Sequence, residues 1–408
     1  MKVLGIIVEY NPFHLGHLHH LKSAVELTNA DYVVAVMSGN FVQRGEPAII
    51  DKFARTEMAL KAGVDIVFEI PTIYAIQDAS GFALGSIGLL NATNVVSDVV
   101  FGSESGDIDL FSKIAGIILK EPSLYRQNLR RYLKKGLSFP NARRFAICDF
   151  LKGLDPNEMK RSNNILAIEY LVSLKKLNSK IKAHTIKRVG SSYNDENLTS
   201  IPSATAVRKA VLEGKKITGL PGFSSRILER EMTDGRGPIF MKDIFEIMKF
   251  KMLTSSREKM ESLYGFNEGM AKRMLDNLDK PTMEEFLKAV KTKRFTLTRI
   301  KRRILYTIFD VERDFILDSN EYGPQYLRLL GFRERGRKIL RIISDRSSIP
   351  LISTASKFDR SIQQRNVYVP LAKRQFDLDV KATDVYSLLF KKDNAKIHRD
   401  FKRLVIES

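Results

Sequence analysis

The first residues that could do chemistry form a histidine cluster near the N-terminus, in the stretch NPFHLGHLHH. His14 and His17 bracket Leu15 and Gly16 as H-x-G-H, directly after an apolar run that predicts a buried strand. Imidazole N–H groups can donate to phosphates and stabilise charge as pyrophosphate leaves. Gly16 allows close approach of a phosphate, and free N–H groups at the helix start would bind phosphate oxygens. The spacing predicts a nucleotide site with His14 and His17 as catalytic residues.

A histidine-rich metal site is the alternative, because four of the six histidines fall within residues 14–20. We expect His19 and His20 on the helix surface or beside a substrate, and we predict no metal held by the chain itself. Mg²⁺ would accompany a bound nucleoside triphosphate, although the sequence shows no carboxylate pair dedicated to binding it. Pro12 would stiffen the entry to the turn.

Polar residues also follow the second and fourth predicted strands. Arg44 and Lys52, in SGNFVQRGEPAIIDK, could meet phosphate or RNA, and a plain surface loop is the alternative. Gly102, in FGSES, would let an adenine or ribose lie against the backbone. Glu104 could bind a hydroxyl group or open the next helix. Strand ends of a parallel sheet meet at one edge, which is where ligands bind.

Two later segments add further candidates. SNNILAIEYL (162–171) reads as a helix in which Ser162, Asn163 or Asn164 is the cap. Arg188 follows a predicted strand and precedes a glycine–serine turn, a suitable position for a phosphate clamp; a surface ion pair is the alternative.

SATAVRK (203–209) begins another helix, after Pro202. The hydroxyls of Ser203 and Thr205, together with Arg208, could hold a triphosphate at the helix start. An ordinary capped helix is the alternative. Lys209 is a second candidate cation, so the residue that would meet the phosphates stays open.

The elements that must position these residues alternate regularly over the first hundred residues. Apolar runs at strand spacing are separated by amphipathic segments at helix spacing, which predicts an α/β, Rossmann-like, doubly wound parallel sheet. A returning strand is expected at 179–190, and a mostly helical, basic region follows, with a strand-like stretch at 336–354. We predict a catalytic domain at 1–215 and a mostly helical, basic, nucleic-acid-binding region at 216–408. The predicted strands are 2–8, 31–39, 64–70 and 95–105, and the helices between them are 14–28, 51–63 and 78–92.

Charge is divided unevenly along the 408 residues. Residues 1–110 hold 6 Lys or Arg and 13 Asp or Glu, whereas the rest holds 61 basic and 34 acidic residues. This distribution favours a catalytic domain joined to a polyanion-binding surface, with solvated helix faces as the alternative. The chain has a single cysteine, Cys148, so no disulfide can form within it. We expect Cys148 in the core. With one cysteine, a reducing cytoplasm is the natural compartment. No apolar run of membrane-spanning length exists, so no membrane partner is expected, and no protein partner is implied.

Read together, these motifs resemble one protein family. The strand with H-x-G-H is similar to the nucleotidylyltransferase superfamily. The wider set GIIVEYNPFHLGHLHHL, MSGNFVQRGEPAIIDKFARTEMAL, DIVFEIP, FGSESGD, SNNILAIEYL and SATAVRKA resembles the bacterial tRNA(Met) cytidine acetate ligase family. The resemblance implies that ATP and acetate form acetyl-adenylate, which acetylates N4 of the wobble cytidine (C34) of elongator tRNA(Met). SATAVRK would correspond to the superfamily's second signature, often a lysine-bearing loop, with its lysine displaced to Lys209.

The resemblance also implies that Asn163 reaches the nucleotide. The predicted ATP-binding set is Ile7, Val8, Glu9, Tyr10, Asn11, Pro12, Phe13, His14, Leu15, Gly16, His17, Leu18, His19, His20, Gly102, Asn163, Arg188, Ser203 and Thr205. The predicted RNA-binding set is Arg44, Lys52, Arg299, Arg302 and Arg303, the last three on an amphipathic basic helix at 293–311. A small-molecule adenylyltransferase and a non-catalytic RNA-binding protein remain the alternative functions.

Overall fold

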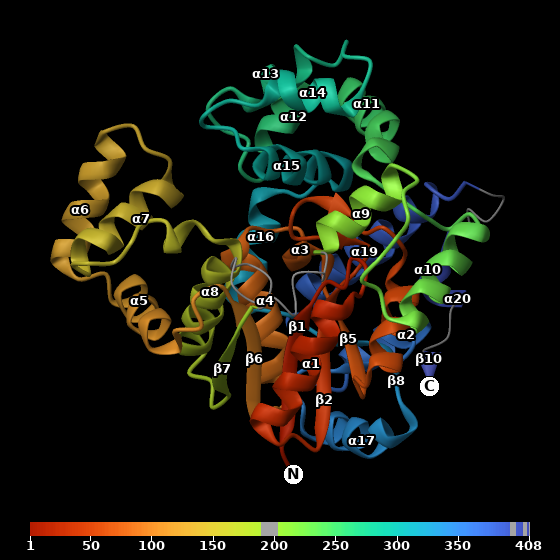
Figure 1. The fold of residues 1–408 in the computed structure, drawn as a ribbon. Helices are drawn as coiled ribbons and strands as arrows, with labels where there is room; N and C mark the ends of the chain where they lie inside the picture. Colours follow the sequence, from red (N-terminus) through yellow and green to blue (C-terminus); the bar gives the residue numbers. More distant parts are fainter. Residues whose placement is uncertain (189–202, 392–396, 403–405, 408) are drawn as a thin grey trace.

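The computed structural model describes residues 1–188, 203–391, 397–402 and 406–407, and a central sheet runs through it (Figure 1). The strand order is β10-β8-β5-β2-β1-β6-β7, with β9 beside β8. All pairings in this sheet are parallel except that of β5 with β8. The strands are β1 Val3–Val8, β2 Tyr32–Ser38, β5 Ile66–Ile70, β6 Asp98–Ser103, β7 Lys182–Lys187, β8 Leu327–Phe332, β9 Leu351–Ile352 and β10 Ile406–Glu407; β3 Phe41–Val42 and β4 Glu46–Pro47 form a separate hairpin.

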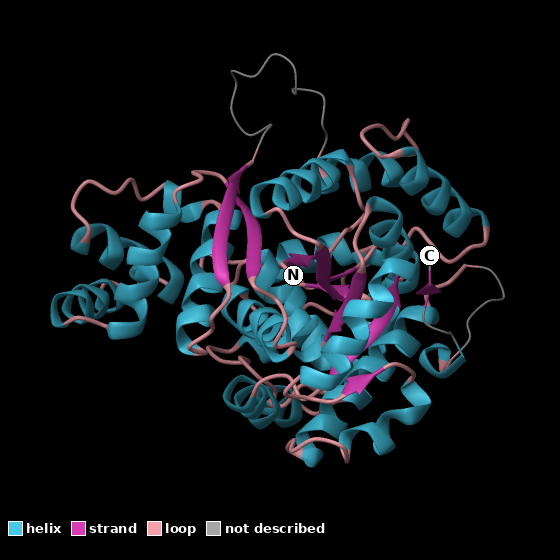
Figure 2. Cartoon of the chain, turned by 90° about the horizontal axis from the view of Figure 1, so that it is seen from below, coloured by secondary structure: helices cyan, strands magenta, loops and turns pink. Residues whose placement is uncertain are grey.

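Both faces of the sheet are covered by helices, which Figure 2 shows from below. Successive residues of β2 alternate between two hydrophobic cores: Val34 belongs to one, and Val33 and Ala35 belong to the other. This alternation follows from the strand period of two and makes the strand apolar throughout. Helices α1 Leu15–Thr28 and α2 Lys52–Ala62 cover one face, and α4 Ala79–Ala92 and α8 Ser162–Lys176 cover the other. The predicted doubly wound α/β fold is confirmed.

The order of strands reverses at β1, which lies between β2 and β6. The chain moves outward from β1 through β2 to β5 and then returns to place β6 on the other side of β1. Such a reversal separates the loops that follow the two strands and opens a ligand site at their carboxyl ends. The H-x-G-H segment follows β1, and FGSES covers the end of β6, so both motifs lie at this point.

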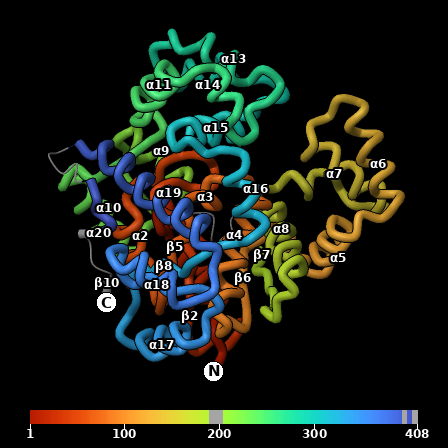
Figure 3. The backbone as a smooth tube through the Cα atoms, turned by 180° about the vertical axis from the view of Figure 1, so that it is seen from behind, coloured from red at the N-terminus to blue at the C-terminus, as the bar shows by residue number. Residues whose placement is uncertain are grey.

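The remaining helices form three groups. One group is a projecting hairpin, a second is a lobe above the carboxyl edge of the sheet (Figure 1), and a third crosses the back of the sheet (Figure 3). Their bounds are α3 Thr72–Ala75, α5 Ile108–Lys120, α6 Ser123–Lys134, α7 Phe139–Phe150, α9 Ala204–Leu212, α10 Gly222–Thr233, α11 Phe245–Leu253, α12 Arg257–Ser262, α13 Met270–Leu275, α14 Met283–Val290, α15 Leu297–Phe309, α16 Arg313–Tyr322, α17 Arg337–Arg346, α18 Phe358–Ile362, α19 Val369–Ser387 and α20 Arg399–Lys402, with 3-10 turns at Glu158–Lys160, Met241–Ile244, Glu334–Gly336 and Ala355–Lys357.

Several expectations need correction. The stretch 336–354 is mainly the helix α17, with only the short β9 at its end. The division after residue 215 stays a prediction, but β8, β9 and β10 from the second region join the main sheet. The two predicted regions therefore share one sheet. Cys148 is half-buried on α7 rather than in the core. The glycine–serine turn expected after Arg188 lies outside the described residues.

Candidate active site

The two histidines of H-x-G-H hold each other in place at the start of α1. His14 caps the helix, and its Nδ1 accepts a hydrogen bond from the Gly16 backbone N–H at 3.0 Å. His17 Nδ1 accepts from the His14 backbone N–H at 3.3 Å, and the two rings stack with 3.8 Å between centroids. Because each Nδ1 acts as an acceptor, the hydrogen-bond network assigns the ring proton to Nε2 in both. Both rings therefore present an Nε2–H donor whose direction is fixed by the backbone.

The first backbone N–H groups of α1 are already occupied. The Leu15 N–H donates to the carbonyl of Gly219 at 2.9 Å. The Gly16 N–H is taken by the His14 ring, and the next two N–H groups of the helix donate to the His14 carbonyl at 2.9 and 3.1 Å. The expectation that these N–H groups are free for phosphate is therefore wrong. The imidazole Nε2–H groups are the donors that remain.

Burial keeps these histidines neutral. It lowers the pKa of His14 to about 4, with a further contribution from the positive charges of Arg188 and Arg208. Burial also lowers the pKa of His17 well below its ordinary value and that of His20 to about 4, with Arg188 acting on both. Among the described residues, no partner binds the buried His20 Nε2. At neutral pH the site thus combines uncharged imidazole donors with nearby arginines.

Two of the predicted nucleotide-binding side chains lie behind the histidines instead. Tyr10 and Phe13 are buried, with ring centroids 5.0 and 5.7 Å from that of His17. Their side chains pack against His17 and are not available to a nucleotide. Only the backbone of these two residues could still contact one. Along the same segment, Asn11 and Pro12 are buried, Ile7, Val8, Glu9, Gly16 and Leu18 are half-buried, and Leu15 and His19 are exposed.

One positioning residue was missed from the sequence. Arg55, on α2, is fully buried and donates to the carbonyls of Glu9 at 2.7 Å and Ser38 at 3.0 Å, and also to that of Gly39. It therefore ties the loops that follow β1 and β2 together. Within KFARTEM its spacing looks like that of any surface arginine, so the sequence carries no signal for this role.

The opposite wall is formed by the ends of β6 and β7. A Cβ atom at Gly102 would lie 3.3 Å from Arg188 Cγ and 3.8 Å from His20 Cδ2, so glycine leaves room for these two side chains. The exposed Arg188 donates from Nη1 to Asn163 Oδ1 at 3.3 Å. Among the described residues it has no carboxylate partner, which disfavours a surface ion pair. Gly102, Asn163 and Arg188 are thus brought together.

Glu104 explains how Asn163 is held. Its carboxylate accepts the Asn163 side-chain N–H at 2.7 Å and the Asn164 backbone N–H at 2.8 Å. The Asn164 Oδ1 accepts the Glu104 backbone N–H at 2.9 Å. The helix α8 is therefore opened by a carboxylate from another segment. The expectation that Ser162 or an asparagine caps it is wrong: the capping position is Arg161, whose side chain makes no capping hydrogen bond.

The start of α9 approaches the H-x-G-H loop through an arginine. Arg208 donates from Nη1 to the Asn11 carbonyl at 2.8 Å and from Nη2 to Thr205 Oγ1 at 3.3 Å. Ser203 caps α9, and Ser203 and Thr205 are both exposed. Lys209 is 71% exposed and lies 3.7 Å from a carboxylate on its own helix. Of the two candidate cations on α9, Arg208 is therefore the one that lies beside the H-x-G-H loop.

Lys52 departs furthest from its predicted role. Its side chain is completely buried, with Nζ 2.8 Å from Glu69 Oε1 and 3.0 Å from Asp400 Oδ1. A buried lysine paired with two carboxylates cannot reach RNA, so that prediction is wrong. Lys52 is the first residue of α2, directly after the capping residue Asp51, and its side chain is buried there. Arg44, in the same loop, is exposed.

The basic residues of α15 are engaged with other parts of the chain. They hold this helix against the β3–β4 hairpin and the turn before α13, and each keeps only part of its surface exposed. Their role in RNA binding stays a prediction. The partners are Glu268, at 3.8 Å, for Arg299, Glu46 for Lys301, the Gln43 carbonyl at 3.4 Å for Arg302, and the Gly265 carbonyl at 3.0 Å for Arg303.

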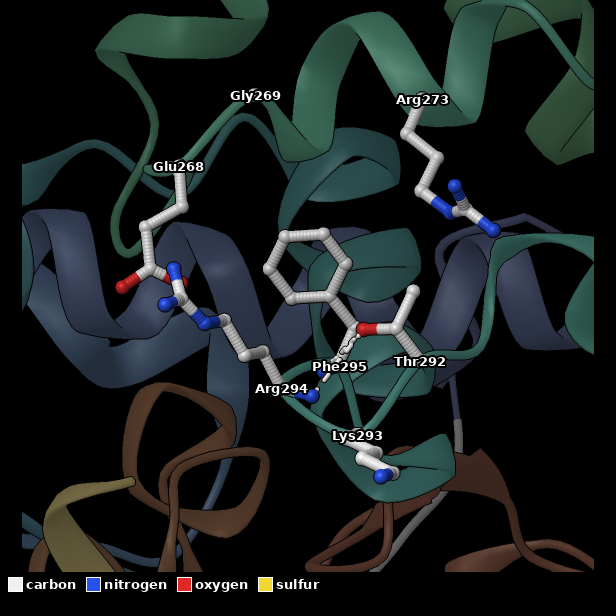
Figure 4. A pocket seen from close by; sticks show the side chains of 7 residues that line it. All are labelled: Glu268, Gly269, Arg273, Thr292, Lys293, Arg294 and Phe295. Atoms are coloured by element: carbon white, nitrogen blue, oxygen red, sulfur yellow. Dashed lines mark hydrogen bonds between the residues drawn. The ribbon is translucent and has the colours of Figure 1, made fainter. Parts of the chain in front are cut away.

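A pocket of about 430 Å³ lies in the helical lobe, away from the histidines (Figure 4). Arg294 and Glu268 point toward each other across its mouth, and Arg273 and Lys293 also line it. Its lining includes none of the residues at the strand ends, so it is separate from the candidate active site. Within the part of the chain that the structure describes, no group of three His, Cys, Asp or Glu side chains could hold a metal ion, and no helix could cross a membrane.

Comparison with known proteins agrees with this geometry. The model of the HIGH Nucleotidyl Transferase family matches residues 1–400. Proteins named tRNA(Met) cytidine acetate ligase from Fervidobacterium nodosum and Thermosipho africanus are 48% and 44% identical, each covering 100% of this chain and 99% of the relative. The chain belongs to the tRNA(Met) cytidine acetate ligase family. The membership predicted from the motifs is confirmed.

A solved member of the tRNA(Met) cytidine acetate ligase family is also similar in three dimensions. The crystal structure of Thermotoga maritima TmcAL bound with alpha-thio ATP has a TM-score of 0.94 at 44% sequence identity, covering 100% of this chain and 99% of that one. The apo form of the same protein gives a TM-score of 0.95. The similarity extends over both predicted regions of the ligase fold, and one of these relatives carries an ATP analogue.

Proposed function

We propose that this chain joins acetate to tRNA in two steps. A carboxylate oxygen of acetate attacks the α-phosphorus of ATP, the bond to the β-phosphate breaks, and acetyl-adenylate and pyrophosphate form. The N4 amine of the wobble cytidine (C34) of elongator tRNA(Met) then attacks the acetyl carbon. The bond to AMP breaks, the amine loses a proton, and N4-acetylcytidine and AMP are the products. Full-length similarity to named ligases supports this reaction over a small-molecule adenylyltransferase.

The observation that carries the proposal is the anchoring of both imidazoles through Nδ1. With that atom bound to a backbone N–H, His14 and His17 each offer Nε2–H to the phosphate oxygens. Negative charge grows on these oxygens as pyrophosphate departs, and donors fixed in advance stabilise it without reorganising. Because the rings are neutral beforehand, they donate hydrogen bonds and need not lose or gain a proton during the step.

Arg188 and Arg208 would supply the positive charge for the triphosphate. Both arginines lie close enough to His14 to lower its pKa. Among the described residues, the hydrogen bonds of each arginine go to neutral groups, the Asn163 side chain for Arg188 and the Asn11 carbonyl for Arg208. A phosphate would therefore gain charge-assisted hydrogen bonds from both. Asn163, oriented by Glu104, would sit beside Arg188. Mg²⁺ with ATP, acetate as the acyl donor and a cytoplasmic location belong to the same proposal.

Transfer of label from [14C]acetate to bulk tRNA tests the reaction directly. We expect labelling that requires ATP and is confined to tRNA(Met), recovered as N4-acetylcytidine. Absence of labelling, with ATP still bound, would contradict the proposal and favour another acceptor.

The histidine roles need a variant that keeps the cap. In His14→Asn, the amide oxygen can replace Nδ1 as acceptor for the Gly16 N–H, but nothing replaces Nε2–H. Acetate-dependent ATP–pyrophosphate exchange should fall by about 10²–10³-fold, the usual effect of losing one such donor. The exposed His19→Asn is the matched control and should retain its rate. Equal rates in both variants would remove His14 from the mechanism.

A further inference from the structure

The hairpin formed by α6 and α7 projects from the body of the protein. Figures 1 and 3 show it on one side of the sheet, with the α6–α7 turn at its free end and the helical lobe beyond the carboxyl edge. Its two helices pack on each other through Tyr125, Ala142, Ala146 and Ile147, which are buried. We refer to residues 123–150 as the arm. Tyr125, Ala146 and Ile147 are continuous with the main hydrophobic core, while Arg126, Arg130, Lys134 and Lys135 lie exposed.

The arm is strongly basic. It contains seven Lys or Arg residues and one acid, Asp149. Arg131 pairs with Asp149 at 2.5 Å, and Arg143 pairs with Glu169 of α8 at 2.7 Å. Four other cations are exposed and have no carboxylate partner among the described residues: Arg126, Arg130, Lys134 and Lys135.

Three of these four cations are arranged as a row. Arg126, Arg130 and Lys134 are four residues apart on α6, so they share one face and are separated by about 6 Å along the helix axis. Like charges at this spacing destabilise a helix by about 0.2–0.5 kcal/mol per pair. The first turn of α6 also lacks an acidic residue that would favour the helix dipole. Phosphates bound along this face would relieve the repulsion between these cations. An ordinary solvated face, on which acidic and basic residues alternate, would have no such repulsion.

The arm is also connected to the candidate active site. The chain leaves α7 and passes through Glu158–Lys160 into α8, whose first turn carries Asn163. Asn163 bonds to Arg188 and Glu104 at the end of the sheet. The arm is thus attached, through α8, to the end of the sheet where Asn163 and Arg188 meet. By contrast, the cations of α15 already bind partners within the chain.

We propose that the arm, rather than α15, is the main phosphate-binding surface for the tRNA. This inference rests on the proposed function, since it names the surface that brings that substrate to the site. Contacts of this kind neutralise backbone phosphates and recognise RNA by shape, without reading its sequence.

The test removes the row of charges without changing side-chain length greatly. The variant is Arg126→Gln/Arg130→Gln/Lys134→Gln, and binding of a tRNA(Met) transcript is measured at several salt concentrations. We expect about 10²-fold weaker binding at 0.1 M salt and a log–log salt slope smaller by about 2–3, because three phosphate contacts are lost. Acetate-dependent ATP–pyrophosphate exchange should be unchanged, which also shows that the variant is folded.

A matched control removes three exposed cations elsewhere. Lys338→Gln/Arg341→Gln/Arg346→Gln alters α17, at the opposite end of the sheet (Figure 1), and should leave tRNA binding within a few-fold. Equal losses in both variants, or a salt slope unchanged in the arm variant, would overturn the arm assignment. So would loss of binding to anionic lipid vesicles alone, with tRNA binding intact. Failure of the wild type to use acetate, with arm-dependent tRNA binding retained, would instead overturn the proposed reaction.

Discussion

Lys52→Met should destabilise the protein strongly and should not act on RNA binding directly. Lys52 Nζ lies 2.8 Å from Glu69 and 3.0 Å from Asp400, and all three side chains are buried. Arg328 is the second cation of this cluster, 3.3 Å from Glu69 and 2.9 Å from Asp400. The two buried cations face the carboxylates of Glu69 and Asp400, and the buried Asp379 also interacts with Lys52, Arg328 and Glu69. Methionine would therefore leave the cluster with too little positive charge.

The magnitude follows from that imbalance. Removing one partner of a buried ion pair costs about 3–5 kcal/mol, because the remaining charge stays desolvated. Total stabilities are about 5–15 kcal/mol, so the loss is a large part of the whole. Replacing Glu69 as well, in Lys52→Met/Glu69→Met, leaves Arg328 and Asp400 as a balanced pair. The double variant should recover much of the loss despite carrying two changes.

Urea-induced unfolding followed by circular dichroism at pH 7.5 measures these effects. The control is Lys61→Met, an exposed lysine at the end of the same helix, which should change stability by no more than about 0.5 kcal/mol. Equal stabilities of Lys52→Met and Lys61→Met would refute the buried cluster. Normal stability combined with weakened tRNA binding would restore the RNA role that the sequence suggested for Lys52.

Three other perturbations address the site. The free energy of unfolding should fall by about 1.6 kcal/mol between pH 6.5 and 5 through His14, because the unfolded residue takes up a proton there while the folded one, with its pKa of about 4, does not. His14→Asn should lose this share of the pH dependence, and an unaltered dependence would contradict the neutral histidine. Arg208→Met should raise the KM for ATP in acetate-dependent exchange by about 10-fold or more, whereas Lys209→Gln should leave it within about twofold; the reverse order would return the phosphate role to the lysine. Glu104→Gln should destabilise α8 by about 1 kcal/mol and raise the KM for ATP, since Asn163 loses a charged partner; an unchanged KM would separate Asn163 from nucleotide binding.

The sequence by itself determined the fold class and the position of the histidine site. Its apolar runs predicted β1, β2, β5 and β6, and the spacing between them predicted the helices, because strand and helix periods differ and each side of the sheet needs cover. Asp51 and Gly63 marked the ends of α2 through cap chemistry that acts within a few residues. H-x-G-H lay at a strand end, so local pattern was enough to place it at the carboxyl edge.

Only the tertiary structure decided which charged and polar side chains reach that edge. β8 joins β5 from more than 250 residues away, and its Arg328 balances the carboxylates around Lys52. Glu104 opens α8, and Arg55 braces two loops, through hydrogen bonds between segments that are distant in sequence. Capping, pairing and burial of this kind depend on which segments meet. A local pattern can show that a lysine or a histidine is present, but packing alone settles whether it is buried, neutral or free to bind.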